Sequence, residues 1–105
     1  MEKVHFAIER LLDAPNGWRS VVRDMVARWP DAQASELIYV LVAAANEIEA
    51  MFSEGSPSRD AADRAWRLAA LLGVDLFAMD VVGIPNSKAK DMAGYWKIDP
   101  YFRDL

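Results

Sequence analysis

Nine consecutive apolar residues, LIYVLVAAA from Leu37 to Ala45, constrain the fold of this chain more than any other stretch. They sit within a helical pattern that covers about residues 32–53. A helix that is apolar on nearly all sides over two turns is normally buried on several sides. Charged residues interrupt the pattern before it reaches the run of about 18 apolar residues that a membrane span requires. We therefore expect the central helix of a bundle here, and no membrane segment.

Projecting this segment at about 100° per residue separates a broad core face from a second apolar face. The core face contains Leu37, Ile38, Leu41, Ala44, Ala45, Ile48, Met51 and Phe52. The second face contains Tyr39, Val40, Val42 and Ala43, where a surface helix normally carries charges. One bundle of this size has few elements with which to cover both faces. The second face is therefore predicted to contact another molecule.

Apolar periodicity and capping residues predict further helices on both sides of the central one. The expected helices are Val4–Leu12, a second one from about residue 16 to Trp29, Ser58 to about Val82, and Ser87 to about Trp96. Gly73 either bends the helix predicted from Ser58 to about Val82 or ends it. If Gly73 ends this helix, Asp75 caps a short helix that follows. No alternating pattern is long enough for a strand. The predicted fold is all-α, a small bundle of four to six helices in one domain, residues 1–105.

The C-terminal part of the chain is rich in aromatic residues, which are costly to leave in water. We expect residues 97–105 either to fold back on the bundle or to dock on a neighbouring molecule. Together with the second face of the central helix, this gives a candidate interface of Tyr39, Val40, Val42, Ala43, Tyr95, Trp96, Tyr101 and Phe102. A two-fold homodimer is the commonest way to close such a surface, and a different protein partner is the alternative.

Composition narrows the classes of function. With 12 basic and 16 acidic residues the net charge is −4, which argues against nucleic-acid binding because that affinity depends on neutralising phosphates. The chain has no cysteine, and Met1 is followed by polar residues with no apolar signal region, so we expect a cytoplasmic protein. Arginine outnumbers lysine two to one, which hints at a bacterial source with a GC-rich genome.

One stretch, Leu68 to Val82, resembles a helix-turn-helix motif in its packing positions. Ala69 is the small residue of the first helix, and Gly73 is in the turn four residues later. The residues that would face DNA are Leu76, Phe77, Ala78, Asp80 and Val81. A recognition helix needs donors for phosphates and base edges, and these residues offer none. A DNA-binding regulator is therefore an alternative hypothesis, and a simple helix pair is the preferred interpretation.

The sequence contains few residue patterns typical of catalytic or metal-binding sites. His5 and Glu9 lie on the same edge of a predicted helix and would supply two of the three or four ligands of a metal site. Asp60 and Asp63 are better explained as the first turn of a helix, where the helix dipole favours anions. The chain has no nucleophile elbow and no glycine-rich phosphate loop. We expect no cofactor and no metal, and a metal-dependent helical enzyme is the third hypothesis.

Two polar residues occupy positions where the helical pattern predicts apolar residues. Asn46 closes the long apolar run, and Asp80 projects onto a face shared with core residues. A buried carboxylate without a partner has a raised pKa, and such groups often mark functional sites. The sequence therefore predicts a candidate buried polar site at Asn46 and Asp80. The leading hypothesis is a small helical interaction or oligomerisation module without catalytic activity.

Overall fold

Six α-helices and one short 3-10 helix make up the described part of the chain, residues 2–105 of this computed structural model. The α-helices are α1 Glu2–Asp13, α2 Gly17–Arg28, α3 Ala34–Met51, α4 Asp60–Val81, α5 Ala89–Tyr95 and α6 Tyr101–Asp104; the 3-10 helix η1, Pro57–Arg59, precedes α4. No strand occurs within residues 2–105. The prediction of a small all-α bundle around a central apolar helix is confirmed.

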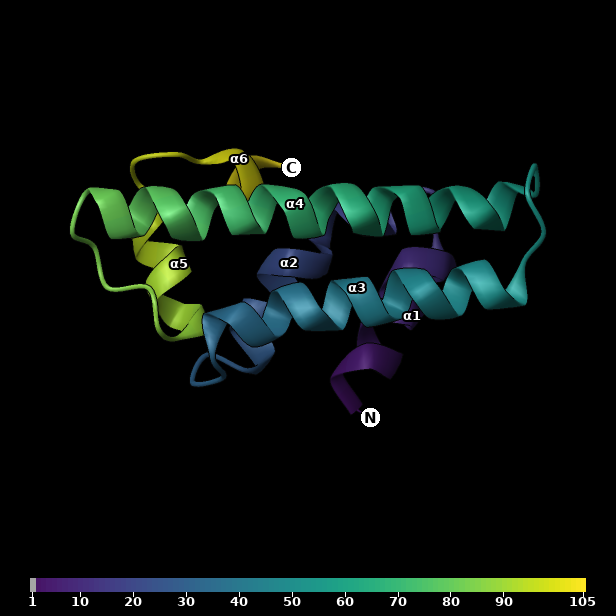
Figure 1. Ribbon diagram of the computed structural model, residues 1–105, viewed down its shortest axis with the longest axis horizontal. Helices are drawn as coiled ribbons and strands as arrows, with labels where there is room; N and C mark the ends of the chain where they lie inside the picture. The colour runs from purple at the N-terminus through teal and green to yellow at the C-terminus, as the bar shows by residue number, and fades with distance from the viewer. Residues whose placement is uncertain (1) are drawn as a thin grey trace.

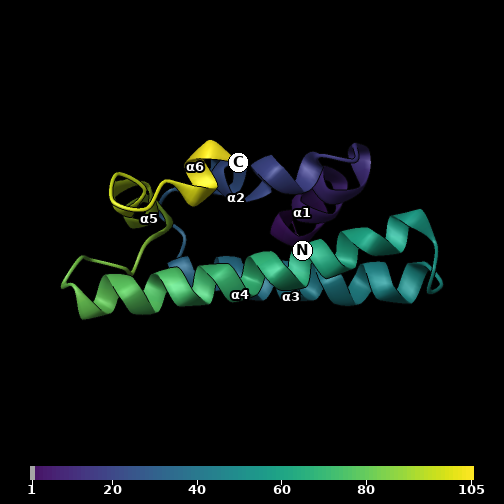
Figure 2. The same ribbon diagram turned by 90° about the horizontal axis from the view of Figure 1, so that it is seen from above.

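The helices form two layers. The two longest, α3 and α4, lie side by side and antiparallel, and α1, α2, α5 and α6 cover one side of this pair (Figures 1 and 2). The molecule measures 42 × 24 × 19 Å, with α4 along its longest dimension. Of the helices described, none is both long enough and apolar enough to cross a membrane. The side of the α3–α4 pair that faces away from the second layer has no other helix over it.

The central helix α3 carries most of the core. Its inner residues are fully buried by α4 on one side and by α1 and α5 on another: Ala34, Leu37, Val40, Leu41, Ala44, Ala45 and Ile48. The bounds Ala34–Met51 agree with the predicted range 32–53 to within two residues at each end. Trp29 and Pro30 end the preceding helix as predicted, since a residue before proline disfavours the helical region.

Helix α4 runs unbroken through Gly73 for 22 residues. The prediction that Gly73 bends or ends the helix, with Asp75 as a cap, is therefore wrong. A single glycine inside a helix costs only about 1 kcal/mol, which the packing of α4 against α3 outweighs. The helix ends instead at Val81, two residues before Gly83, where φ is +78°. There the N–H of Ile84 donates to the carbonyl of Met79 at 2.8 Å, and the Gly83 N–H donates to the carbonyl of Asp80 at 3.2 Å, which together form a Schellman motif.

Backbone contacts tie the start of α5 to the α2–α3 connection. The N–H of Ala34 donates to the carbonyl of Ser87 at 2.9 Å, and the N–H of Ala89 donates to the carbonyl of Ala32 at 2.8 Å. These bonds satisfy groups at the starts of α3 and α5 that the helices themselves leave free. They bring the C-terminal third of the chain back onto the core.

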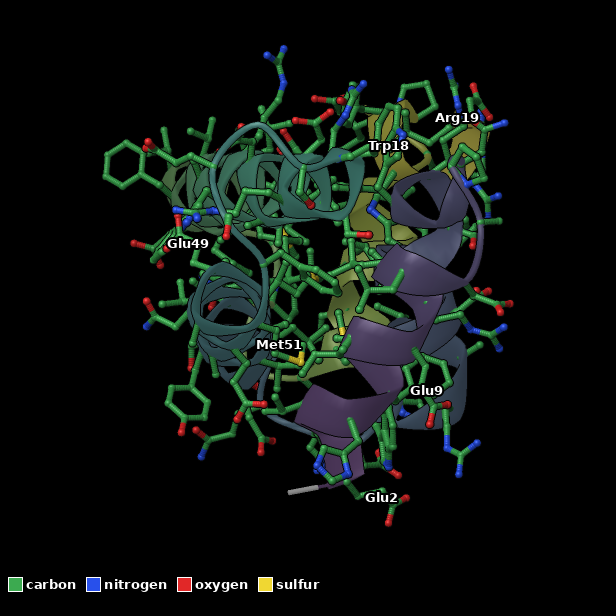
Figure 3. The ribbon with its side chains drawn as sticks, turned by 90° about the vertical axis from the view of Figure 1, so that its right-hand side faces the viewer. Glu2, Glu9, Trp18, Arg19, Glu49 and Met51 are labelled. Carbon is green, nitrogen blue, oxygen red and sulfur yellow. The ribbon has the colours of Figure 1, made fainter. Side chains whose placement is uncertain are left out.

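Close contacts also join helices within the second layer and join that layer to α4. Gly17 opens α2 so close to α1 that a side chain there would overlap the carbonyl oxygen of Arg10. The ring of Trp18, on α2, lies 4.5 Å from the guanidinium of Arg64 on α4 and 4.8 Å from that of Arg19. Figure 3 shows Trp18 and Arg19 together at the edge of the molecule. This cation–π contact with Arg64 links the second layer to α4.

We expect the substitution Leu41→Asp to unfold the protein. Leu41 is fully buried at the centre of α3, so the variant places an uncompensated charge in the core. The expected cost is several kcal/mol, comparable with the total stability of about 5–15 kcal/mol of a typical domain. The matched control is Ala93→Asp, which adds the same charge at an exposed position of α5 in the second layer. Circular dichroism melts should show loss of the cooperative transition for Leu41→Asp alone; a near-native melt in that variant would contradict the assignment of α3 as the core helix.

Candidate functional site

Four residues of the predicted interface lie inside the chain's own core. Val40, Tyr95, Trp96 and Phe102 are all buried, with exposed fractions of 8% or less. Their assignment to a contact between molecules is therefore corrected. Val40 is covered because the packed side of α3 is wider than the projection suggested, and the three aromatic residues are covered because α5 and α6 fold onto α2.

The C-terminal segment is held by a basic side chain of α2. The guanidinium of Arg23 donates from Nη1 to the carbonyl oxygens of Phe102 at 3.3 Å, Arg103 at 3.3 Å and Leu105 at 3.2 Å. Carbonyls at a helix C-terminus lack partners within the helix and attract a cation. Of the two arrangements predicted for residues 97–105, the structure shows the one that folds back on the bundle. Tyr101 remains partly exposed at its edge.

The other predicted interface residues lie on the open side of α3. Tyr39 is 55% exposed, and Val42 and Ala43 are half-buried beside it. Figure 3 shows the two layers end on, with Glu49 of α3 pointing away from α1 and α2 on this open side. These three residues thus lie on a surface that no other element in the described part of the chain covers.

Helix α4 contributes a second row of exposed apolar residues. Val74, Phe77 and Val81 are 63%, 71% and 68% exposed, and their spacing of three and four residues places them on one side of the helix together with Ala70. Helices α3 and α4 are antiparallel and joined by a short connection. A residue twelve positions before the end of α3 therefore lies at the same height along the pair as a residue twelve positions after the start of α4. Tyr39 is therefore level with the segment around residue 72.

We call these two rows together the outer apolar face: Tyr39, Val42, Ala43, Ala70, Val74, Phe77 and Val81. The α4 row was absent from the predicted interface. The sequence did contain evidence for this row, because Phe77 and Val81 were among the apolar residues that argued against a DNA recognition helix. With Gly73 assigned to a turn, their alignment with Ala70 along one long helix could not be seen.

Gly73 lies beside this row without any packing reason within the chain. A β-carbon built on it would have no atom within 4 Å. Alanine in its place would lower the free energy of a free helix by about 0.5–1 kcal/mol.

The helix-turn-helix hypothesis for Leu68 to Val82 is wrong. The stretch forms one continuous part of α4 and contains no turn. Its apolar exposed residues belong to the outer apolar face.

The residues considered for metal binding stand apart. His5 and Glu9 are exposed on α1, and Asp60 and Asp63 occupy the exposed first turn of α4, where the helix dipole favours carboxylates. Within residues 2–105, no group of three or more His, Cys, Asp or Glu side chains is arranged to hold a metal ion.

Neither member of the predicted buried polar pair is buried. Asn46 lies on the open side of α3, and Asp80 lies beyond its start, because residue 80 of α4 is level with the connection that precedes Ala34. The buried acid is Asp75, which is 8% exposed. It escaped the sequence analysis because the assumed break at Gly73 made it a cap.

Asp75 lies in an environment that disfavours its charge. Its Oδ2 atom is buried without a hydrogen-bond partner. Burial raises the pKa of this carboxyl to about 6, and the negative charge of Asp99 adds to the shift. The pKa of the Tyr95 phenol is also raised, by burial first and then by the charges of Asp75 and Asp99. We call Asp75, Tyr95 and Asp99 the Asp75 cluster.

Comparisons of this chain with protein-family models, with curated protein sequences and with solved structures found no match. The outer apolar face and the Asp75 cluster are the two features from which function can be argued.

The Asp75 carboxyl should make stability depend on pH. Its pKa is about 6 in the folded chain and close to 3.8 when solvated, so the folded state holds the proton more tightly. The contribution of Asp75 to stability is therefore largest below about pH 4 and falls as the pH rises through this window. Asp75→Asn removes the ionisation. At about pH 7.5 its free energy of unfolding should exceed that of the wild type by roughly 2–3 kcal/mol.

The measurement is urea unfolding of both proteins at several pH values. The difference between them should shrink toward zero near about pH 4, because both side chains are then neutral. A constant difference across the range would show that Asp75 is not the titrating group.

Proposed function

We propose that this protein is a helical interaction module that forms a two-fold homodimer through the outer apolar face. The observation that carries the proposal is Phe77, which is 71% exposed in the C-terminal part of a long helix and is flanked along one side by Val74 and Val81. Scattered apolar residues are ordinary on a protein surface, but a continuous row beside a second row on the neighbouring helix marks an association surface.

The size of the face supports a second copy as its partner. The 18 residues of α3 extend for about 27 Å, and two packed helices are about 18–20 Å wide, so the whole open side of the α3–α4 pair, which contains the outer apolar face, projects to roughly 500 Å². Pairing the open sides of two copies buries about 1,000 Å² in total. This is the lower limit at which specific protein interfaces are found.

The shape of the face also favours pairing with itself. Ala70 and Gly73 are small, and Phe77, on the same side of α4, is large. When two copies of α4 meet antiparallel about the level of residues 73 and 74, Phe77 of each copy lies over Ala70 of the other. Large residues over small ones allow helices to pack ridge into groove. The open space at Gly73 then receives the partner's helix.

The setting of this function is part of the proposal. We place the protein in the cytoplasm, since a chain without cysteine suits a reducing compartment, and in a bacterium, on the excess of arginine over lysine. The alternative occupant of the face, a helix of a different protein, would leave the isolated chain monomeric.

We predict that the wild-type protein has twice the 11.8 kDa mass of one chain at tens of micromolar, and that Phe77→Glu has the mass of one chain. Two buried carboxylates facing apolar surface would cost far more than such an interface contributes. The measurement is sedimentation equilibrium. Ala93→Glu, which adds the same charge at an exposed position of α5 in the second layer, is the matched control and should remain a dimer.

A second variant separates association from folding. In a monomer, Gly73→Ala has room for its methyl group and should raise stability by up to about 1 kcal/mol. In the proposed dimer the same methyl obstructs close approach and should weaken association. A wild-type protein that stays monomeric, or a Phe77→Glu variant that keeps the dimer mass, would refute the proposal.

A further inference from the structure

A groove lies where the second layer meets the start of α4. One wall is the last turn of α1 with its connection to α2, and the other is η1 with the first two turns of α4. Trp18, near the start of α2, lines the groove, and Figure 3 looks onto this end of the molecule. The groove has a volume of about 410 Å³, within the range of about 300–1,000 Å³ typical of small-molecule sites.

Apolar side chains from both walls line much of the groove: Leu12, Pro15, Trp18, Pro57 and Ala61. The ring of Trp18 is half-buried, and the guanidinium of Arg64 lies 4.5 Å from its centroid. This cation–π contact joins the two walls and holds the ring in place. An aliphatic chain lying across the groove would remove apolar surface from water on both walls.

Three charged groups line the same groove without pairing with one another. They are the carboxylates of Asp13 and Asp60 and the guanidinium of Arg64, all three on exposed side chains. None of the three forms an ion pair within residues 2–105. In the neighbouring hollow beside α1, by contrast, the guanidinium of Arg10 is paired with Asp24 at 3.5 Å. The groove therefore offers two anions and one cation to a ligand of opposite charges.

The positions of these groups determine how the ligand's charges must be arranged. Asp60 and Arg64 are four residues apart on α4, which makes their side chains neighbours on the helix surface. An ammonium and a carboxylate bonded to one carbon atom are close enough together to contact both. Asp13 is on the facing wall, at the C-terminal end of α1, where the helix dipole also attracts a cation. A second cation is therefore expected across the groove from the first.

We propose that this groove binds a free α-amino acid with a cationic side chain, of which lysine and arginine are examples. Its α-carboxylate contacts Arg64 in a charge-assisted hydrogen bond, and its α-ammonium contacts Asp60. Its methylene chain crosses the groove beside Trp18, and its side-chain cation reaches Asp13. The inference is independent of dimerisation, because α1 and α2 lie on the side of the α3–α4 pair away from the outer apolar face.

The test is an NMR titration of the full-length protein at pH 7 and constant ionic strength, followed at the indole N–H of Trp18. L-Lysine should cause a saturable shift with a Kd of about 1 mM or tighter. Norleucine has the same backbone without the side-chain cation, and pentane-1,5-diamine has both cations without the carboxylate. Each analogue should bind at least about tenfold more weakly than lysine, because each leaves one charged group of the groove unmatched.

Variants assign each charge of the ligand to its residue. Asp13→Asn should weaken lysine binding about tenfold and leave norleucine binding unchanged. Arg64→Gln should weaken the binding of both amino acids and leave that of pentane-1,5-diamine unchanged. The matched control is Arg67→Gln, which removes the same charge from an exposed position of α4 outside the groove and should bind lysine like the wild type.

The site is refuted if lysine up to about 20 mM causes no saturable shift at Trp18, or if norleucine binds as tightly as lysine. It is also refuted if Arg67→Gln loses as much affinity as Arg64→Gln, since general attraction to the surface would then explain the binding. Arg64 contacts Trp18, so its variant is checked by a thermal melt. Asp13→Asn makes the test independent of that outcome, because unchanged lysine binding in this variant would by itself contradict the proposal.

Discussion

The packing of α3 against α4 is the interaction on which the rest of the structure depends. Helix α3 is apolar around most of its circumference, so it needs neighbours on several sides. Helix α4 covers one side along its whole length, and the second layer covers another. No element among residues 2–105 covers the remaining side. The outer apolar face is thus a direct consequence of having one very apolar helix and only two layers with which to bury it.

The same pairing decides which polar residues are buried. Helix α4 extends past the start of α3, so Asp80 reaches solvent although it lies on a line of core residues. Asp75 lies five residues earlier, within the length of α4 that pairs with α3, and is only 8% exposed. Its buried Oδ2 atom has no hydrogen-bond partner among residues 2–105.

Much of this fold could be predicted from local patterns, because they act over short distances. The proline after Trp29 acts locally, and the second helix ends within one residue of the predicted position. The predicted break at Gly73 was wrong because a helix interior tolerates glycine when tertiary packing supplies the missing stability. The sequence analysis predicted only the α3 row of the outer apolar face. Tyr39 and Val40 look equivalent in sequence, yet one is open and the other buried, since the position of α4 around α3 is a property of the folded chain.

Pairing of two chains across the outer apolar face is the central claim, and a single introduced thiol tests it most directly. The chain has no cysteine, so Val74→Cys carries one reactive group near the proposed two-fold axis, and Ala93→Cys carries one on α5. Mild oxidation at equal concentration should convert Val74→Cys to a disulfide-linked dimer much faster than Ala93→Cys, because the two sulfur atoms are held close before they react. Equal rates for the two variants would contradict an interface built on this face.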